Sequence, residues 1–310
     1  MENKEKIQIA ADNKGNFAPN KKAYFSLAAI SLVWGTTWVV SKIGIQGIPG
    51  LQLSYIRQFT AGLLFLIFFK LKGEPRPTLK QFKWLFILSL FMIVFSNGVS
   101  TWSLKYISSG LGALIGTLFP LCVVVIEMIW FRHSLNNKIT IVGMIIGFAG
   151  LLLVFYENAF HHQPEGYVLG VIMAFLATLS WSIGVILVAR KQLHMNPYNA
   201  MGWQMFLGSF PIMLAAMATH NHIPFIEVPM KTWLSITYLV FFGSIAAFAG
   251  MIYTVKHLPA AIASLYAYFN PIVALLIGAA ILHEKLTPSI IIGSLITLSG
   301  VYIVNRSMKK

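Results

Sequence analysis

The sequence has few charged residues and very few acidic ones. Only 10% of its 310 residues are charged, and Lys and Arg number 23 against 9 Asp and Glu. A soluble domain carries about 25% charged residues, so the composition excludes a cytosolic or secreted globular protein. The sequence also lacks a Ser/His/Asp set, paired carboxylates within its apolar segments and a Gly-rich phosphate loop. These absences argue against an enzyme and against an ATP-driven pump.

Cysteine is almost absent as well. Cys122 is the only one, so no intramolecular disulfide can form. No set of Cys and His residues has the spacing of a metal site. We therefore expect neither a metal nor another cofactor.

Long apolar runs, in contrast, fill most of the chain. Hydrophobic residues make up 57% of it, and its mean hydropathy is +0.74. A helix needs about 20 consecutive apolar residues to cross a bilayer. The pattern predicts an all-α polytopic membrane protein embedded in the lipid bilayer. Its ten expected spans are roughly 24–43, 51–70, 84–104, 109–131, 139–157, 166–188, 199–219, 232–255, 260–282 and 288–305.

The basic residues predict the orientation of these spans. If the N-terminus is cytoplasmic, 18 of the 23 Lys and Arg residues fall on the inner side and 4 on the outer side. Such a bias marks the cytoplasmic face, so we expect both termini to be cytoplasmic. The net charge of +14 then lies along a membrane face, where it suits anionic lipid rather than nucleic acid.

One segment occurs twice. LIGTLFPLCVVVIEMIWFRHSLNN (Leu114–Asn137) aligns without a gap with LYAYFNPIVALLIGAAILHEKLTP (Leu265–Pro288), which places Pro120 on Pro271. The chain therefore reads as two halves of five spans, and because five is odd, the second half is inverted in the membrane. Inverted repeats around a central cavity are typical of secondary transporters. The predicted parts are a disordered cytosolic tail (1–23), the first repeat (24–157), an outer linker (158–165), the second repeat (166–306) and a cytosolic tail (307–310).

The repeated prolines are the first candidates for a substrate pathway. A proline within a helix removes a backbone donor and kinks the helix, and carbonyls freed in a membrane must face protein or a water-filled cavity. Pro120 and Pro271 lie about midway along their spans. A kink that serves packing alone is the alternative.

Polar and aromatic residues within the spans are further candidates. Asn97 and Thr101 lie beside a stripe of serines on the third span, for which helix packing by small residues is the alternative. Tyr266 and Asn270 are four residues apart and share a helix face. Three tryptophans add aromatic surface to the expected pathway: Trp34, Trp38 and Trp181. Of these, Trp34 and Trp181 occupy matching mid-span positions in the two halves.

Two charged residues lie within spans. Arg57 is about two turns into the second span, where it either binds a substrate carboxylate or phosphate or extends to the outer interface. Glu127 is about one turn from the inner end of the fourth span. It is the one candidate for proton coupling, and pairing with a neighbouring base or extension to the interface is the alternative.

Small residues form faces on the fifth and tenth spans. Gly143, Gly147 and Gly150 lie on the fifth, and Gly293 and Gly300 on the tenth. Such faces permit close helix approach. We expect them to pack within the chain or to join two copies, so the protein is a monomer or a homodimer through these helices.

The chain carries several short motifs in a fixed order. They are the mid-span Trp34–Gly35 pair, the K-x-L-P-A-A stretch before the ninth helix (Lys256–Ala261), the F-N-P and H-E-K-L-T motifs of the ninth helix region, and the closing Gly293–Val301 pattern. Together these motifs resemble the drug/metabolite transporter superfamily, specifically EamA-type permeases. The first half departs from the pattern, with His133 where the second has Glu284. The resemblance implies a ten-helix fold in a bacterial inner membrane, with a central cavity built by spans 1–4 and 6–9 and with spans 5 and 10 at the periphery.

The sequence thus favours a secondary transporter of a small metabolite, such as an amino acid or a similar amphipathic compound. Alternating access is the expected mechanism, and export is favoured over uptake. An antiporter of sugar phosphates or nucleotide sugars is the alternative within transport, although it would need several cations in the cavity. A membrane sensor or enzyme is the alternative of another class.

Overall fold

The computed structural model describes residues 20–131, 138–160, 165–191, 193–258, 260–263 and 265–307. Within these residues, nine helical spans are long and apolar enough to cross a membrane, and the 17-residue α14 is a shorter apolar helix. The all-α polytopic membrane fold is thereby confirmed. In chain order, the ten passes are formed by α2 (Lys21–Gly44); α3 (Gly50–Leu71); α4 (Leu79–Ser89), η1 (Leu90–Gly98) and α5 (Val99–Ser103); α6 (Ser109–Gly116) and α7 (Phe119–Phe131); α8 (Lys138–Phe160); α9 (Tyr167–Arg190); α10 (Pro197–Ala218); α11 (Met230–Tyr238), η3 (Leu239–Ala246) and α12 (Ala247–His257); α13 (Ala260–Ala263) and α14 (Tyr266–Leu282); and α15 (Pro288–Ser307).

The ends of several helices are set by capping residues. Asn20 accepts a hydrogen bond from the Ala23 amide at 3.3 Å, so α2 begins at Lys21 and residues 21–23 belong to the first helix rather than to the tail. Thr78 and Gln81 form a reciprocal capping box, which starts the third pass five residues before the predicted boundary. The predicted tail residues 1–19 and 308–310, and residues 161–164 of the predicted linker, lie outside the described residues.

The third pass of each repeat contains a π-helical segment. These segments are η1 in the first repeat and η3 in the second. A π-helix is uncommon and often lies at a functional site. Its occurrence at equivalent places gives the two repeats a shared feature that apolar periodicity could not predict.

The fourth and ninth passes are interrupted, but not at the prolines. α6 ends at Gly116 and α7 starts at Phe119, so the break at Thr117 and Leu118 precedes Pro120. Pro120 occupies the first turn of α7, where its missing N–H costs little. Pro271 lies inside α14, which starts only at Tyr266. The break in each pass thus lies on the N-terminal side of the proline rather than at it.

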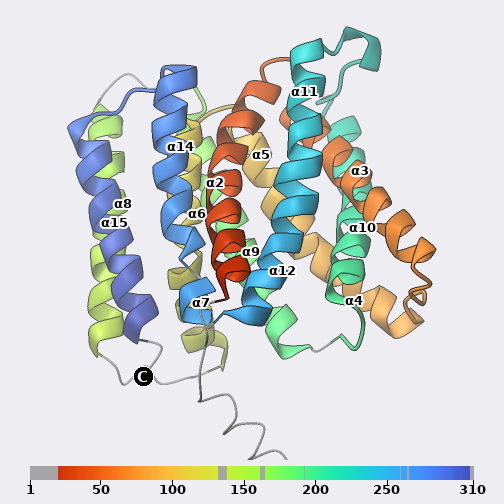
Figure 1. Cartoon of the computed structure of the whole chain (residues 1–310). Coiled ribbons are helices and arrows are strands. Elements are labelled where there is room, and N and C mark those ends of the chain that lie inside the picture. Colours follow the sequence, from red (N-terminus) through yellow and green to blue (C-terminus); the bar gives the residue numbers. More distant parts are fainter. Residues whose placement is uncertain are drawn as a thin grey trace, which may run out of the picture.

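The first helix of each repeat packs into the other repeat. α2 contacts α11, α12 and α14 of the second repeat, and α9 contacts η1, α5, α6 and α7 of the first. α3 and α10 pack on each other, which joins the repeats a third time (Figure 1). The repeats therefore share one helical bundle instead of forming two separate bodies.

α8 and α15 form a pair at one side of this bundle (Figure 1). The glycines of one helix face those of the other: a Cβ at Gly300 would lie 2.2 Å from the Gly147 amide nitrogen, and one at Gly150 would lie 2.4 Å from the Thr297 nitrogen. The absence of these side chains lets the two backbones touch. The packing within the chain that the sequence predicted is thus present, and a homodimer through the remaining surfaces of α8 and α15 stays a prediction.

Candidate functional site

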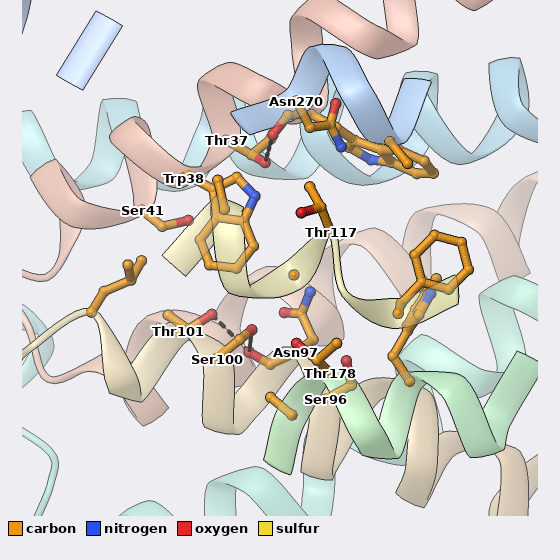
Figure 2. A pocket seen from close by; sticks show the side chains of 18 of the residues that line it. Thr37, Trp38, Ser41, Ser96, Asn97, Ser100, Thr101, Thr117, Thr178 and Asn270 are labelled. Carbon is orange, nitrogen blue, oxygen red and sulfur yellow. Dashed lines mark hydrogen bonds between the residues drawn. The ribbon is translucent and has the colours of Figure 1, made fainter. Parts of the chain in front are cut away.

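A cavity of about 190 Å³ lies where the two repeats meet. Its wall comes from both repeats, and Figure 2 shows many of its side chains pointing into a common space. α8 and α15 contribute no lining residue among those that the structure describes. The lining residues are Trp34, Thr37, Trp38, Ser41, Arg57, Ser96, Asn97, Ser100, Thr101, Leu104, Ala113, Gly116, Thr117, Phe119, Ala177, Thr178, Trp181, Phe248, Tyr266, Ala267 and Asn270.

The cavity extends from the middle of the bundle toward the end opposite the chain termini. On α2 its lining residues run from Trp34 to Ser41, in the second half of the helix. The end that bears residues 21 and 307, which we call the terminal end, is closed by an apolar cluster that includes Leu27, Ile30 and Leu258. Tyr266 belongs to both the cluster and the cavity wall, so it marks the boundary between them.

Hydroxyl groups form much of the wall. Ser100 and Thr101 donate to the Asn97 carbonyl oxygen at 3.1 and 2.8 Å, as Figure 2 shows, which leaves their oxygens able to accept from a ligand. Thr37 in the same way donates to the Trp34 carbonyl oxygen at 2.7 Å. The remaining serine and threonine hydroxyls of the wall are those of Ser41, Ser96, Thr117 and Thr178.

Two amide side chains lie in the wall. Gln58 is fully buried, and its Nε2 donates to Asn97 Oδ1 at 2.8 Å, so the partner of Asn97 lies on α3. With its amide oriented so that nitrogen donates, Asn270 bonds the carbonyl oxygens of Ser31 at 3.0 Å and of Tyr266 at 3.2 Å. The side chain of Asn97 thereby connects η1 to α3. The side chain of Asn270 connects α14 to α2 and also bonds the preceding turn of its own helix.

Aromatic rings line the part of the cavity nearest the closed end. Trp34 makes edge contacts with Phe248 and Tyr266, at centroid separations of 5.4 and 5.0 Å. Its Nε1 donates to the Gly243 carbonyl oxygen in η3 at 3.2 Å. Trp34 thus joins α2 of the first repeat to the π-helical segment of the second.

Arg57 is the only lining residue with a formal charge among the described residues. Arg57 is 5% exposed. It therefore does not extend to the outer interface, which was the alternative considered from the sequence. Nε donates to Ser244 Oγ at 2.9 Å, and Nη2 donates to the Gly243 carbonyl oxygen at 3.2 Å. A Cβ at Gly243 would lie 3.3 Å from Nη2, so the glycine permits this close approach.

Glu127 does not line the cavity. Its Oε1 lies 3.3 Å from Arg190 Nη2, and the two side chains are 33% and 43% exposed. The pairing with a neighbouring base that the sequence left open is therefore the arrangement observed. Glu127 lies near the terminal end of α7, away from the polar wall.

Most of the residues predicted to form a substrate pathway meet in this cavity. Pro120 and Pro271 are buried outside the wall, and the residues before them, Phe119 and Asn270, line it instead. Whether any of these residues touches a substrate stays a prediction. The predicted residues that line the cavity are Trp34, Trp38, Arg57, Asn97, Thr101, Trp181, Tyr266 and Asn270.

Sequence reasoning missed Gln58 and the Gly243–Ser244 pair. Gln58 directly follows Arg57, so a polar pair in an apolar span was the available signal. Gly243 and Ser244 are small residues within a long apolar run, and nothing in that pattern shows that their backbone is π-helical. The serine stripe of the third span was a spacing signal, and its members Ser96 and Ser100 line the cavity. The hydroxyl residues of the other helices had no such signal.

Comparison with known proteins places this geometry in a family. Residues 21–156 and 168–306 each match the model of the EamA-like transporter family. The chain is 27% identical to the uncharacterized transporter YoaV of Bacillus subtilis, over 91% of this chain and 96% of that protein. It is also 27% identical to the uncharacterized inner membrane transporter YedA of Escherichia coli, over 84% and 83% of the two chains.

A solved crystal structure shares the fold. It superimposes with a TM-score of 0.63 at 14% identity, covering 94% of this chain and 99% of that chain. The two family matches coincide with the two five-pass repeats that the structure joins around one cavity. The chain is a multi-pass membrane protein that belongs to the EamA-like transporter family.

Proposed function

We propose that this protein is a secondary transporter that moves a small amphipathic metabolite, such as an amino acid, across the inner membrane of a bacterium. The observation that carries the proposal is a cavity between inverted repeats that is lined by hydroxyl, amide and aromatic side chains and bordered by an apolar cluster at one end. In transporters built from inverted repeats, the substrate site lies near the midplane at the repeat interface. The lining residues Trp34 and Thr178 lie near the middle of α2 and α9.

Alternating access supplies the transport step. With cytoplasmic termini, as the charge bias predicts, the observed cavity faces outward and the apolar cluster of Leu27, Ile30 and Leu258 closes the inner side. Rocking of the repeats would open that cluster and close the outer half around Ser41 and Leu104. We favour export over uptake, with release to the outside from the observed conformation.

The composition of the wall favours an amphipathic substrate over a phosphorylated one. Aromatic rings offer surface to an apolar group, and hydroxyls and amides offer hydrogen bonds. An antiporter of sugar phosphates or nucleotide sugars would need several cations to neutralise a phosphate group. Among the described lining residues, Arg57 is the only cation.

Energy coupling rests on one candidate. Glu127 is ion-paired with Arg190 at the edge of the bundle, so protonation would have to act by breaking this pair rather than inside the cavity. Proton antiport through Glu127 and gradient-driven diffusion without coupling make different predictions. Replacing Glu127 by Gln abolishes any response to a pH gradient in the first case and leaves the rate unchanged in the second.

The test is efflux from proteoliposomes loaded with a mixed pool of metabolites, measured by mass spectrometry with and without an imposed pH gradient. We expect selective loss of one class of amphipathic metabolites compared with liposomes without protein. The same pool placed outside detects an exchanger that needs substrate on both sides. A protein that moves nothing from the pool in either arrangement would contradict the proposal.

A further inference from the structure

Among the described residues, the cavity wall holds one buried charge and none of the opposite sign. Arg57 is 5% exposed and lies in the wall. No Asp or Glu lines the cavity in the part of the chain that the structure describes. A cation removed from water is strongly disfavoured unless an anion or a set of hydrogen bonds replaces its hydration.

The protein supplies only part of that replacement. A guanidinium has five N–H donors, and the acceptors that the described residues offer are the Gly243 carbonyl oxygen and Ser244 Oγ. Both acceptors are neutral, and both lie in η3. They hold the guanidinium in one orientation without cancelling its charge, so the rest of its donors are available to a ligand in the cavity.

We infer that the transported substrate carries a single carboxylate and that Arg57 binds it. This inference rests on the proposed transport function and narrows its substrate class. The planar guanidinium fork matches a carboxylate, which can accept two parallel hydrogen bonds from it. The carboxylate of a bound substrate thus supplies the counter-ion for Arg57 that the described lining residues do not provide.

The remainder of the wall limits the substrate further. With one cation present, a dicarboxylate or a phosphate ester would bring more negative charge than the site neutralises. With no acid among the described lining residues, a lipophilic cation would have no ion partner. An amino group is accommodated by the ring faces of Trp34 and Tyr266 and by hydroxyl oxygens, whereas an apolar side chain packs on the same rings.

The test compares four charge forms of one set of side chains. Proteoliposomes are loaded with leucine, valine, phenylalanine and tryptophan, together with their carboxamides, their N-acetyl derivatives and their N-acetyl carboxamides. The set includes a zwitterion, a cation, an anion and a neutral form of each compound. Efflux of every form is read in one experiment, so the ratio of carboxylate to carboxamide does not depend on the amount of active protein.

We expect each carboxylate to leave at least tenfold faster than its carboxamide, whether or not the amine is acetylated; tenfold corresponds to about 1.4 kcal/mol. In Arg57→Gln this ratio falls to near one, and in Arg57→Lys it is partly retained because the charge remains but the fork is lost. Arg76→Gln is the matched control, since Arg76 is exposed and lies outside the wall, and it keeps the wild-type ratio.

Two results overturn the inference. One is equal efflux of carboxylates and carboxamides through the wild-type protein, a result that stands even if Arg57→Gln fails to fold. The other is an unchanged ratio in Arg57→Gln. Failure of the proposed function looks different, because then nothing moves from either this set or the mixed metabolite pool.

Discussion

α8 and α15 are equivalent helices of the two repeats, and they meet through the same kind of residue on both sides. α3 and α10 are also equivalent, but their eighth residues are Arg57 and Gln204, and only Arg57 lines the cavity. η1 likewise contributes Ser96 and Asn97 to the wall, whereas none of the residues of η3 lines it. The contacts between helix backbones are thus alike in the two repeats. Among the residues that face the cavity, Trp34 and Trp181 match, whereas the polar and charged residues named above do not.

The comparison has a physical reason. In a close helix contact the backbones of both helices touch. Each helix therefore needs small residues at the contact, so the two repeats need the same kind of residue there. A small substrate has no such symmetry, and its charged end needs one cation rather than two. The site for an asymmetric ligand is therefore built by making equivalent positions different.

Breaking the symmetric contact should have the largest effect. Gly300→Leu places a side chain where a Cβ would already lie 2.2 Å from the Gly147 nitrogen, and backbone cannot move aside as a side chain can. We expect a loss of about 3 kcal/mol of stability and a marked fall in monodisperse protein, measured by size-exclusion chromatography and thermal unfolding. Ser299→Leu, at an exposed neighbouring position of α15, is the control and should behave like wild type. Equal behaviour of the two variants would show that the glycine contact does not hold the helix pair together.

The asymmetric amide pair should have the next largest effect. Asn97→Leu removes the acceptor of Gln58 Nε2 and leaves a buried donor unpaired, at a cost of about 1–3 kcal/mol. The double variant Gln58→Leu/Asn97→Leu should recover part of this loss, because no unpaired donor remains. Thermal unfolding of the two single variants and the double variant measures the coupling. Strictly additive losses would mean that the pair is not coupled.

The bond between Trp34 and η3 should matter less. Trp34→Phe removes the Nε1 donor to the Gly243 carbonyl oxygen but retains an aromatic ring beside Phe248 and Tyr266. A neutral hydrogen bond contributes about 1 kcal/mol, which is roughly a fivefold change in rate if the bond acts in the transport step. The comparison is the initial efflux rate at equal amounts of folded protein. Trp34→Ala should reduce this rate more strongly, because it removes the ring as well as the donor. Equal rates for the two variants would assign the effect to the hydrogen bond alone and contradict a role for the ring.

The counterpart of Arg57 should tolerate change best. Gln204 is 4% exposed, and its Oε1 has no hydrogen-bond partner among the described residues. Gln204→Leu removes this unpaired acceptor, so we expect efflux within about twofold of wild type and equal or slightly higher stability. Arg57→Leu at the equivalent position should abolish selective efflux. Similar losses in both variants would contradict the functional difference between α3 and α10.

The apolar runs and the duplication were enough to predict the bundle and its inverted symmetry. Hydropathy reports burial in lipid directly, and an odd number of spans in each half fixes the inversion. The position of Arg57 in the cavity could be proposed but not decided, since a long cationic side chain can reach either an interior or an interface. Its contact with Gly243 joins residues 186 positions apart through a π-helical backbone, and a local pattern carries no signal for such a contact. The prolines are an example in which a local signal misled. Their effect on a helix predicted kinks at Pro120 and Pro271, but the helix breaks lie before these residues.

The central claim is that one cavity is reached in turn from both faces of the membrane. It is tested most directly by labelling Ser100→Cys, in the cavity wall, in a protein whose buried Cys122 is replaced by Ala. A membrane-impermeant thiol reagent is added to right-side-out vesicles and, separately, to inside-out vesicles. Leu32→Cys, whose side chain is 58% exposed on the outer surface of the bundle near mid-span of α2, is the control that should be labelled from neither side. Alternating access predicts labelling of Ser100→Cys from both sides, whereas labelling from one side alone would make the cavity a closed-ended cleft and contradict the account.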